Sequence, residues 1–209
     1  MQHYYTNNPI SNKNEKIIYG IIKGEKYKFL TDNGVFSKKF IDFGTKTLLE
    51  SFHTERKKLE ICDLGCGYGV VSVFLANNYE DFSFTMIDIN KRCLELSKKN
   101  IELNKIKSKI EIIENNVLDK ISKKFDIILT NPPIRAGKNV VFKIMEQSYH
   151  SLNEGGELWV VIQKKQGMSS VKKLLEKIFN SVIIVKKNKG YYVLKSLKNW
   201  LFNTNMITW

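Results

Sequence analysis

Short apolar runs alternate with amphipathic segments along most of this chain. Runs rich in Ile, Val, Leu and Phe predict strands at 59–62, 82–87, 110–113, 125–130 and 158–162. Apolar residues at helical spacing predict helices at 45–52, 70–76, 91–104, 138–152 and 171–179. Because strands and helices alternate, we predict an α/β fold with a doubly wound, mostly parallel sheet.

Two further pairs of apolar runs, at the two ends of this pattern, predict antiparallel hairpins. The paired runs are 17–22 with 27–31, and 182–185 with 191–194. The turn of the first hairpin is expected at Lys23-Gly24-Glu25-Lys26. The second pair is expected to form the end of the sheet. Gly155-Gly156 is expected to end the helix that precedes the fifth strand of the main pattern.

The domain organisation is expected to be simple. No repeat or low-complexity linker divides the 209 residues, so we predict a single domain, 1–209. Residues 1–14 are polar, lack the apolar core of a signal peptide and are expected to be flexible. We assign 15–33 to the N-terminal β-hairpin, 34–195 to the cofactor-binding and catalytic core, and 196–209 to a C-terminal tail. The aromatic tail is expected to pack on the domain or on a second subunit.

Composition narrows the class of protein. Apolar residues make up 43% of the chain and charged residues 26%, which is ordinary for a globular protein. No apolar run approaches the ~20 residues of a membrane span, so we expect no membrane association. Cys62, Cys66 and Cys93 stand in apolar or loop contexts, and no second ligand pair completes a zinc site. These features predict free thiols in a reducing cytoplasm and no metal.

The net charge of +13 points to a polyanionic partner. Lysine pairs recur along the second half of the chain, and neutralised phosphates dominate nucleic-acid affinity. The alternative is a general bias towards Lys, Asn and Ile, in which case many lysines only solvate the surface. Charge alone therefore favours contact with RNA or DNA, with a lysine-rich solvated surface as the alternative.

The segment Asp63-Leu64-Gly65-Cys66-Gly67-Tyr68-Gly69 connects an apolar strand to a helix, as nucleotide-cofactor loops do. Its GxGxG spacing differs from the dinucleotide fingerprint GxGxxG, whose third glycine would fall at Val70. Asp88 follows the loop by about twenty residues and is placed to accept ribose hydroxyls. These features fit NAD, FAD or S-adenosylmethionine. Asp63 could face the amino group of an amino-acid-bearing cofactor, which favours S-adenosylmethionine, and Asn116 is placed to recognise adenine.

Asn131-Pro132-Pro133 ends the fourth strand and points to methylation of an exocyclic amine. Such a nitrogen is a poor nucleophile because its lone pair is delocalised. The Asn131 side-chain oxygen and the Pro132 carbonyl are suited to accept both N–H bonds, and the prolines stiffen the turn. No strong base is required, and in-line positioning can contribute ~7–11 kcal/mol. His3, His53 and His150 lie outside every candidate site. Taken alone, Asn-Pro-Pro also fits an ordinary turn after a strand.

Three motifs together resemble the class I S-adenosylmethionine-dependent methyltransferases. They are Gly34-Val35-Phe36-Ser37, the loop 63–69, and Asn131-Pro132-Pro133-Ile134-Arg135-Ala136-Gly137-Lys138. Within that class they resemble the small-domain group that includes the 16S rRNA guanine-N2 methyltransferases, over roughly 27–195. The resemblance implies a Rossmann-like sheet of seven strands whose last strand is antiparallel, beside the small N-terminal hairpin.

The resemblance also implies a set of site residues. The cofactor-binding residues would be Phe40, Gly44, Thr45, Asp63, Gly65, Cys66, Gly67, Asp88, Ile89, Asn116, Val117 and Asn131. The catalytic residues would be Asn131, Pro132, Pro133 and Ile134. Arg135 and Lys138 would bind RNA beside the target pocket.

The sequence departs from this group in ways that leave the acceptor open. Many amino-methylating relatives have an aromatic residue after the prolines, where this chain has Ile134, and the guanine-N2 enzymes often carry a second, non-catalytic amino-terminal half. The leading hypothesis is methylation of guanine N2 in ribosomal RNA, free or in a ribosomal subunit, by a monomer or homodimer. The alternatives are a protein glutamine N5-methyltransferase and a non-catalytic S-adenosylmethionine-binding ribosome-assembly protein.

Overall fold

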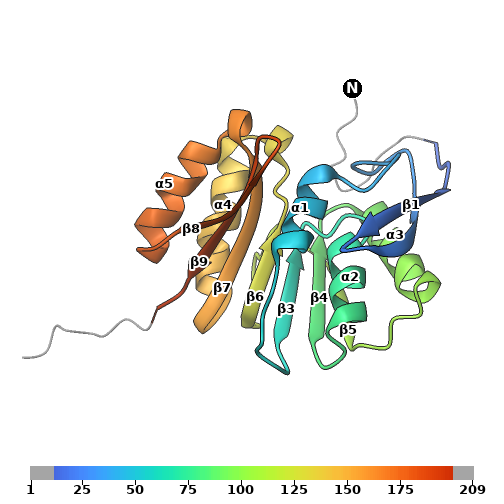
Figure 1. Ribbon diagram of the computed structural model, residues 1–209, viewed down its shortest axis with the longest axis horizontal. Coiled ribbons are helices and arrows are strands. Elements are labelled where there is room, and N and C mark those ends of the chain that lie inside the picture. Colours follow the sequence, from blue (N-terminus) through green and yellow to red (C-terminus); the bar gives the residue numbers. More distant parts are fainter. Residues whose placement is uncertain (1–11, 200–209) are drawn as a thin grey trace, which may run out of the picture.

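The computed structural model describes residues 12–199, with one seven-stranded sheet and a separate two-stranded hairpin (Figure 1). The strands are β1 (Lys16–Ile22), β2 (Glu25–Thr31), β3 (Glu60–Leu64), β4 (Ser83–Asp88), β5 (Ile110–Glu114), β6 (Phe125–Thr130), β7 (Leu152–Gln163), β8 (Ile183–Asn188) and β9 (Tyr191–Leu197). The helices are α1 (Phe43–Ser51), α2 (Val70–Asn78), α3 (Lys91–Leu103), α4 (Lys138–Ser151) and α5 (Met168–Phe179), with short 3-10 turns η1 (Ile134–Ala136) and η2 (Lys164–Gln166).

The sheet has the strand order β5-β4-β3-β6-β7-β9-β8. Neighbouring strands from β5 to β7 are parallel, and β9 runs antiparallel between β7 and β8. The order in which strands are added to the sheet reverses between β3 and β6, and ligands of such sheets bind at the carboxyl ends of the strands beside this switch point. The predicted fold class, with its antiparallel last strand and N-terminal hairpin, is confirmed.

Helices cover both faces of the sheet, α1 and α2 on one side and α4 and α5 on the other (Figure 1). The first core contains Phe29 of the hairpin, Phe52 and Phe74, and the second contains Phe125 and Phe179. Both faces of the central strands are buried, and β3 and β6 are accordingly mostly apolar in sequence. The same core that joins the sheet to α1 and α2 also holds the hairpin in place.

Two turns differ from the sequence prediction. The first hairpin turns on Lys23-Gly24 alone, since Glu25 already pairs with Ile22; the positive φ angles of 49° and 86° fit a two-residue hairpin turn. Gly155-Gly156 lies inside β7 and does not end α4, which stops at Ser151. The pairing of β6 with β7 shifts from Phe125↔Leu152 to Ile127↔Glu157, so the glycines form a bulge. A Cβ atom at Gly156 would lie 2.8 Å from a backbone oxygen.

The described residues leave out 1–11 and 200–209, so the predicted flexible segment 1–14 and the predicted tail 196–209 fall largely outside them. β9 includes Ser196 and Leu197, so regular structure continues into the segment predicted as a tail. Over residues 12–199, no helix is both long enough and apolar enough to cross a membrane.

Candidate active site

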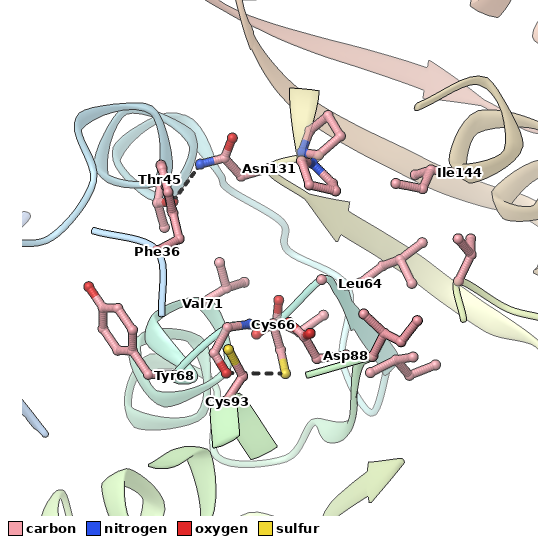
Figure 2. Close-up of a pocket in the computed structure, with 18 of the residues that line it drawn as sticks. Phe36, Thr45, Leu64, Cys66, Tyr68, Val71, Asp88, Cys93, Asn131 and Ile144 are labelled. Atoms are coloured by element: carbon pink, nitrogen blue, oxygen red, sulfur yellow. Dashed lines mark hydrogen bonds between the residues drawn. The ribbon is translucent and has the colours of Figure 1, made fainter. Parts of the chain in front are cut away.

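A cavity of about 430 Å³ opens at the carboxyl ends of β3, β4 and β6, where the sheet reverses its order (Figure 2). Its walls come from the glycine loop, the loop after β4, the Asn-Pro-Pro segment, the start of α1 and one side of α4. Asn131 and Thr45 lie across the cavity from Cys66 and Asp88 (Figure 2). The motifs that were separate in sequence therefore line a common space.

The glycine loop is fastened to the end of β4. The N–H groups of Gly65 and Cys66 donate to the Ile87 carbonyl at 2.8 and 3.0 Å, and the Gly67 N–H donates to Asp88 Oδ2 at 2.9 Å. Gly69 begins α2 at φ 93°, where a Cβ atom would lie 2.9 Å from Met86 Cε. Only glycine fits there without a shift of its neighbours. Nothing lies within 4 Å of a Cβ built on Gly65 or Gly67, so the loop leaves room for a ligand.

Two carboxylates lie beside this loop, on β3 and at the end of β4. Asp63 is 2% exposed and accepts hydrogen bonds from the Ser72 backbone N–H at 3.1 Å and from Ser72 Oγ at 2.8 Å. Burial raises the pKa of Asp63 to about 7, against the lowering effect of Ser72. Burial also raises the pKa of Asp88, although backbone N–H groups of Asn90 and Gly67 bind its carboxylate. A cationic ligand group would offset the cost of ionising this pair.

The Asn131 side chain is held in one orientation. Its Nδ2 donates to Asp42 Oδ2 at 2.8 Å and to Thr45 Oγ1 at 2.9 Å, which occupies both amide hydrogens. The Asn131 oxygen therefore faces away from this pair and is the atom available for a further donor (Figure 2). Asp42 also caps α1, because its Oδ2 accepts from the Thr45 backbone N–H at 2.8 Å.

The prolines continue this arrangement. Pro132 and Pro133 both line the cavity. The Pro133 carbonyl accepts the Ala136 N–H at 2.9 Å, which forms the η1 turn. Among the described residues no hydrogen bond to the Pro132 carbonyl is found. The site thus has two oxygen acceptors near each other in sequence, the Asn131 amide oxygen and the Pro132 carbonyl.

Most of the predicted site residues line the cavity. They are Thr45, Asp63, Gly65, Cys66, Gly67, Asp88, Ile89, Asn116, Val117, Asn131, Pro132 and Pro133. The predicted residues outside the lining are Phe40, Gly44, Ile134, Arg135 and Lys138. Phe40 is 65% exposed, and Gly44 is buried, with room only for hydrogen because a Cβ there would lie 2.9 Å from the Tyr191 ring.

The site residues predicted from the sequence did not include several residues that line the cavity, of which Asp42 matters most. Asp42 stands three residues before Thr45 and directly before an amphipathic segment, the usual position of an N-cap, so the helix-start rule would have singled it out. Phe36, Ser37 and Tyr68 line the same cavity; they belong to the motifs at 34–37 and 63–69 but were not among the predicted site residues. Over the described part of the chain, no three His, Cys, Asp or Glu side chains gather as a metal site would require.

Fold and site together define a class of enzyme. A parallel sheet with an antiparallel β9 between β7 and β8, a glycine loop after β3, an acidic end to β4 and Asn-Pro-Pro after β6 are the features of a class I methyltransferase. Residues 26–195 match the family model described as "Methyltransferase small domain". The chain belongs to this family of S-adenosylmethionine-dependent methyltransferases, which confirms the predicted class and its cofactor.

Individual relatives add detail. The Bacillus subtilis (strain 168) protein YbxB, described as uncharacterized, is 42% identical over 199 residues, which is 94% of this chain and 98% of that protein. The ribosomal RNA small subunit methyltransferase C of Actinobacillus pleuropneumoniae is 34% identical over 161 residues, or 74% of this chain and 47% of that protein. This chain thus spans about half the length of the methyltransferase C relatives.

The solved structures show the same fold. A T. thermophilus 16S rRNA N2 G1207 methyltransferase, in complex with AdoMet and guanosine, superposes with a TM-score of 0.80. The two sequences are 24% identical, and the match covers 91% of this chain and 52% of that chain.

Proposed function

We propose that this protein transfers a methyl group from S-adenosylmethionine to guanine N2 of ribosomal RNA. The observation that carries the proposal is the fixed amide of Asn131, whose oxygen is left as an acceptor; the next residue, Pro132, also lines the cofactor cavity. An exocyclic amine has two N–H bonds to donate, and the Asn131 oxygen and the Pro132 carbonyl match them. Relatives named as ribosomal RNA small subunit methyltransferases support RNA as the acceptor.

The residues present fit the cofactor. The ionised Asp63 would hold the cationic amino group of the cofactor, and the ionised Asp88 would hold its ribose hydroxyls. Gly65 and Gly67 would let the protein backbone approach the cofactor closely. Asn116 and Val117 line the cavity beyond β5, where the adenine would lie. When bound, S-adenosylmethionine supplies an electrophilic methyl group on a sulfonium.

The protein's part in the reaction is to position the acceptor nitrogen. The Asn131 oxygen and the Pro132 carbonyl each accept one N–H bond, which directs the nitrogen lone pair towards the methyl group. S-adenosylmethionine would give its methyl group to this nitrogen and leave as S-adenosylhomocysteine, and the methylated nitrogen would lose one proton to water. No buried base is needed for this step, and His53 and His150 both lie outside the cavity lining.

The test uses purified full-length protein, S-adenosylmethionine, and rRNA offered both deproteinised and in small subunits. Nucleoside mass spectrometry should find N2-methylguanosine, and Asn131→Ala should reduce kcat by roughly 100-fold or more, the size expected for losing one preorganised polar contact. Binding of S-adenosylmethionine should persist in the variant. Methylation at another atom would disprove the acceptor assignment, and full activity of Asn131→Ala would disprove the site.

Two competing functions give different outcomes in the same experiment. A protein glutamine N5-methyltransferase would label protein and leave RNA unmodified, and amino-acid analysis would locate the methyl group. A non-catalytic assembly protein would bind S-adenosylmethionine without turnover on any RNA. The single-domain organisation, 1–209, and a monomeric or homodimeric state remain part of the proposal.

A further inference from the structure

Negative charge is unevenly distributed along this chain. Residues 127–145 contain no Asp or Glu, and residues 158–209 contain only Glu176. Glu176 forms an ion pair with Lys172 on α5. The sequence that forms η1, η2, most of α5 and the strands β8 and β9 is therefore basic with almost no carboxylates to balance it.

The lysines of this part of the sheet differ in their ion pairing between the two ends of its strands. At the amino end of β7, Lys195 pairs with Glu157 at 2.7 Å and Lys198 pairs with Glu154 at 3.2 Å. At the opposite edge, four exposed lysines lie on η2 and on the tip of the β8–β9 hairpin: Lys164, Lys165, Lys187 and Lys189. No ion pair involves any of these four among residues 12–199. We call these four residues the lysine edge.

The lysine edge is physically tied to the active site. The Lys164 N–H donates to the Gly190 carbonyl at 2.7 Å, which joins η2 to the hairpin tip. Tyr191 at that tip packs against Phe43, with ring centroids 5.5 Å apart, and against Gly44. The neighbours of these two residues in sequence bind the Asn131 amide. Figure 1 shows the hairpin tip and the start of α1 at the same end of the molecule.

Aromatic rings lie among these cations. Lys189 Nζ lies 5.5 Å from the centre of the Phe43 ring, and Lys187 Nζ lies 5.7 Å from that of Tyr192. Phe43 belongs to α1, whereas Tyr192 packs with the core beneath α4 and α5, so the two lysines lie on opposite sides of the hairpin tip. Positive groups interleaved with partly exposed rings suit single-stranded nucleic acid, whose phosphates and bases they contact respectively.

We propose that the lysine edge is the docking surface for the RNA segment that flanks the methylated nucleotide. This inference rests on the proposed function and adds where the substrate binds outside the cavity. Arg135 and Lys138, on η1 and at the start of α4, would continue the surface to the catalytic motif. The RNA backbone thus crosses the carboxyl ends of β7 and β8 and the amino end of β9 on its way to Asn131.

The test compares two variants with the same change in charge. The edge variant replaces Lys164, Lys165, Lys187 and Lys189 with glutamine. The control variant replaces four other exposed lysines with glutamine: Lys57, Lys98, Lys107 and Lys109, which lie on α3 and on the loops before β3 and β5. Binding of a guanine-containing rRNA fragment is measured between about 0.05 and 0.5 M salt, together with S-adenosylmethionine affinity and thermal unfolding.

Each lysine that neutralises one phosphate of single-stranded RNA contributes about 0.7 to the slope of log K against log salt. The edge variant should lose up to about 3 from that slope and roughly 10- to 1000-fold in RNA affinity near 0.1 M salt. Its S-adenosylmethionine affinity and unfolding temperature should match those of the parent. The control variant should lose far less RNA affinity.

The outcomes separate this inference from the proposed function. If the parent methylates rRNA but both variants lose RNA affinity equally, the lysine edge is not the docking surface while the proposed function stands. If the parent methylates no RNA, the proposed function fails first. If the edge variant keeps its RNA affinity but loses binding to vesicles of anionic phospholipid, the surface serves a membrane and the inference is overturned.

Discussion

The contact between Asp42 and Asn131 allows a sharp test of how the site orients its amide. The two partners of Asn131 Nδ2 differ in kind. The Thr45 hydroxyl can donate or accept, so it would bind either face of a flipped amide, whereas the Asp42 carboxylate can only accept. Asp42 alone therefore decides that the Asn131 nitrogen faces Asp42 and Thr45 and that the oxygen faces away from them.

The replacement Asp42→Ser isolates this effect. Serine is as good an N-cap as aspartate, so α1 keeps its cap. In the parent, Asn131 Nδ2 lies 2.8 Å from Asp42 Oδ2, and the shorter serine side chain no longer reaches it. A hydrogen bond to a charged group contributes about 1.5–3 kcal/mol, which converts to a fall in kcat of roughly 10- to 100-fold. Asp42→Asn should retain most activity because its side-chain oxygen still accepts. Thr45→Val loses only a neutral partner and should cost about 2- to 10-fold.

Steady-state methylation of rRNA and calorimetric binding of S-adenosylmethionine measure these effects separately. Asp42→Ser should lower kcat while leaving S-adenosylmethionine affinity and the KM for RNA near the parent values. A double-mutant cycle with Asn131→Ala provides the control, since Asp42→Ser should have no further effect once the amide is gone. An equal loss of kcat in both backgrounds would refute the orienting role. Full activity of Asp42→Ser alone would refute it more directly.

Two further predictions concern the glycine loop and its carboxylates. Burial raises the pKa of Asp63 from 3.8 to about 7, so the folded protein binds a proton that the unfolded chain releases between these values. Cofactor-free stability should therefore fall by a few kcal/mol as pH rises from about 4 to 7, and S-adenosylmethionine should bind more tightly as pH rises through 7. Asp63→Asn should weaken both trends in urea unfolding and calorimetry, and the part that remains belongs to Asp88, whose pKa burial also raises; trends of undiminished size would show that Asp63 does not titrate in this range. Gly69→Ala places a Cβ atom 2.9 Å from Met86 Cε at φ 93° and should cost about 1–3 kcal/mol in urea unfolding, whereas an unchanged midpoint would mean that the loop relaxes freely.

Much of the fold follows from the sequence because its signals are local and strong. Buried parallel strands such as β6 are mostly apolar, and amphipathic helices repeat their apolar positions, so both can be located without knowing their partners. The glycines at 155 and 156 show the limit. The same residues favour the end of a helix and a bulge in a strand, and only the pairing of β7 with β6 decides between them.

The candidate site was predictable where its residues belong to contiguous motifs. The loop at 63–69 and Asn131 were found this way because a tight turn or a strand end dictates the residue type. Asp42 carries a local helix-start signal, but its role in holding Asn131 depends on a contact between residues distant in sequence, as does the packing of Tyr191 on Gly44. Such contacts carry no local pattern of their own.

The structure places cofactor binding and acceptor positioning on different elements that meet at one helix. The glycine loop and Asp88 depend on β3, β4 and α2, whereas Asn131 depends on β6 and on α1, through Asp42 and Thr45. The β8–β9 hairpin also rests on the start of α1, through Tyr191. A shift of α1 would therefore change the orientation of the Asn131 amide and the position of the lysine edge together. If RNA docks at the lysine edge, RNA affinity in Asp42→Ser should stay near the parent value while kcat falls, because Tyr191 still packs on Phe43 and holds the hairpin against α1.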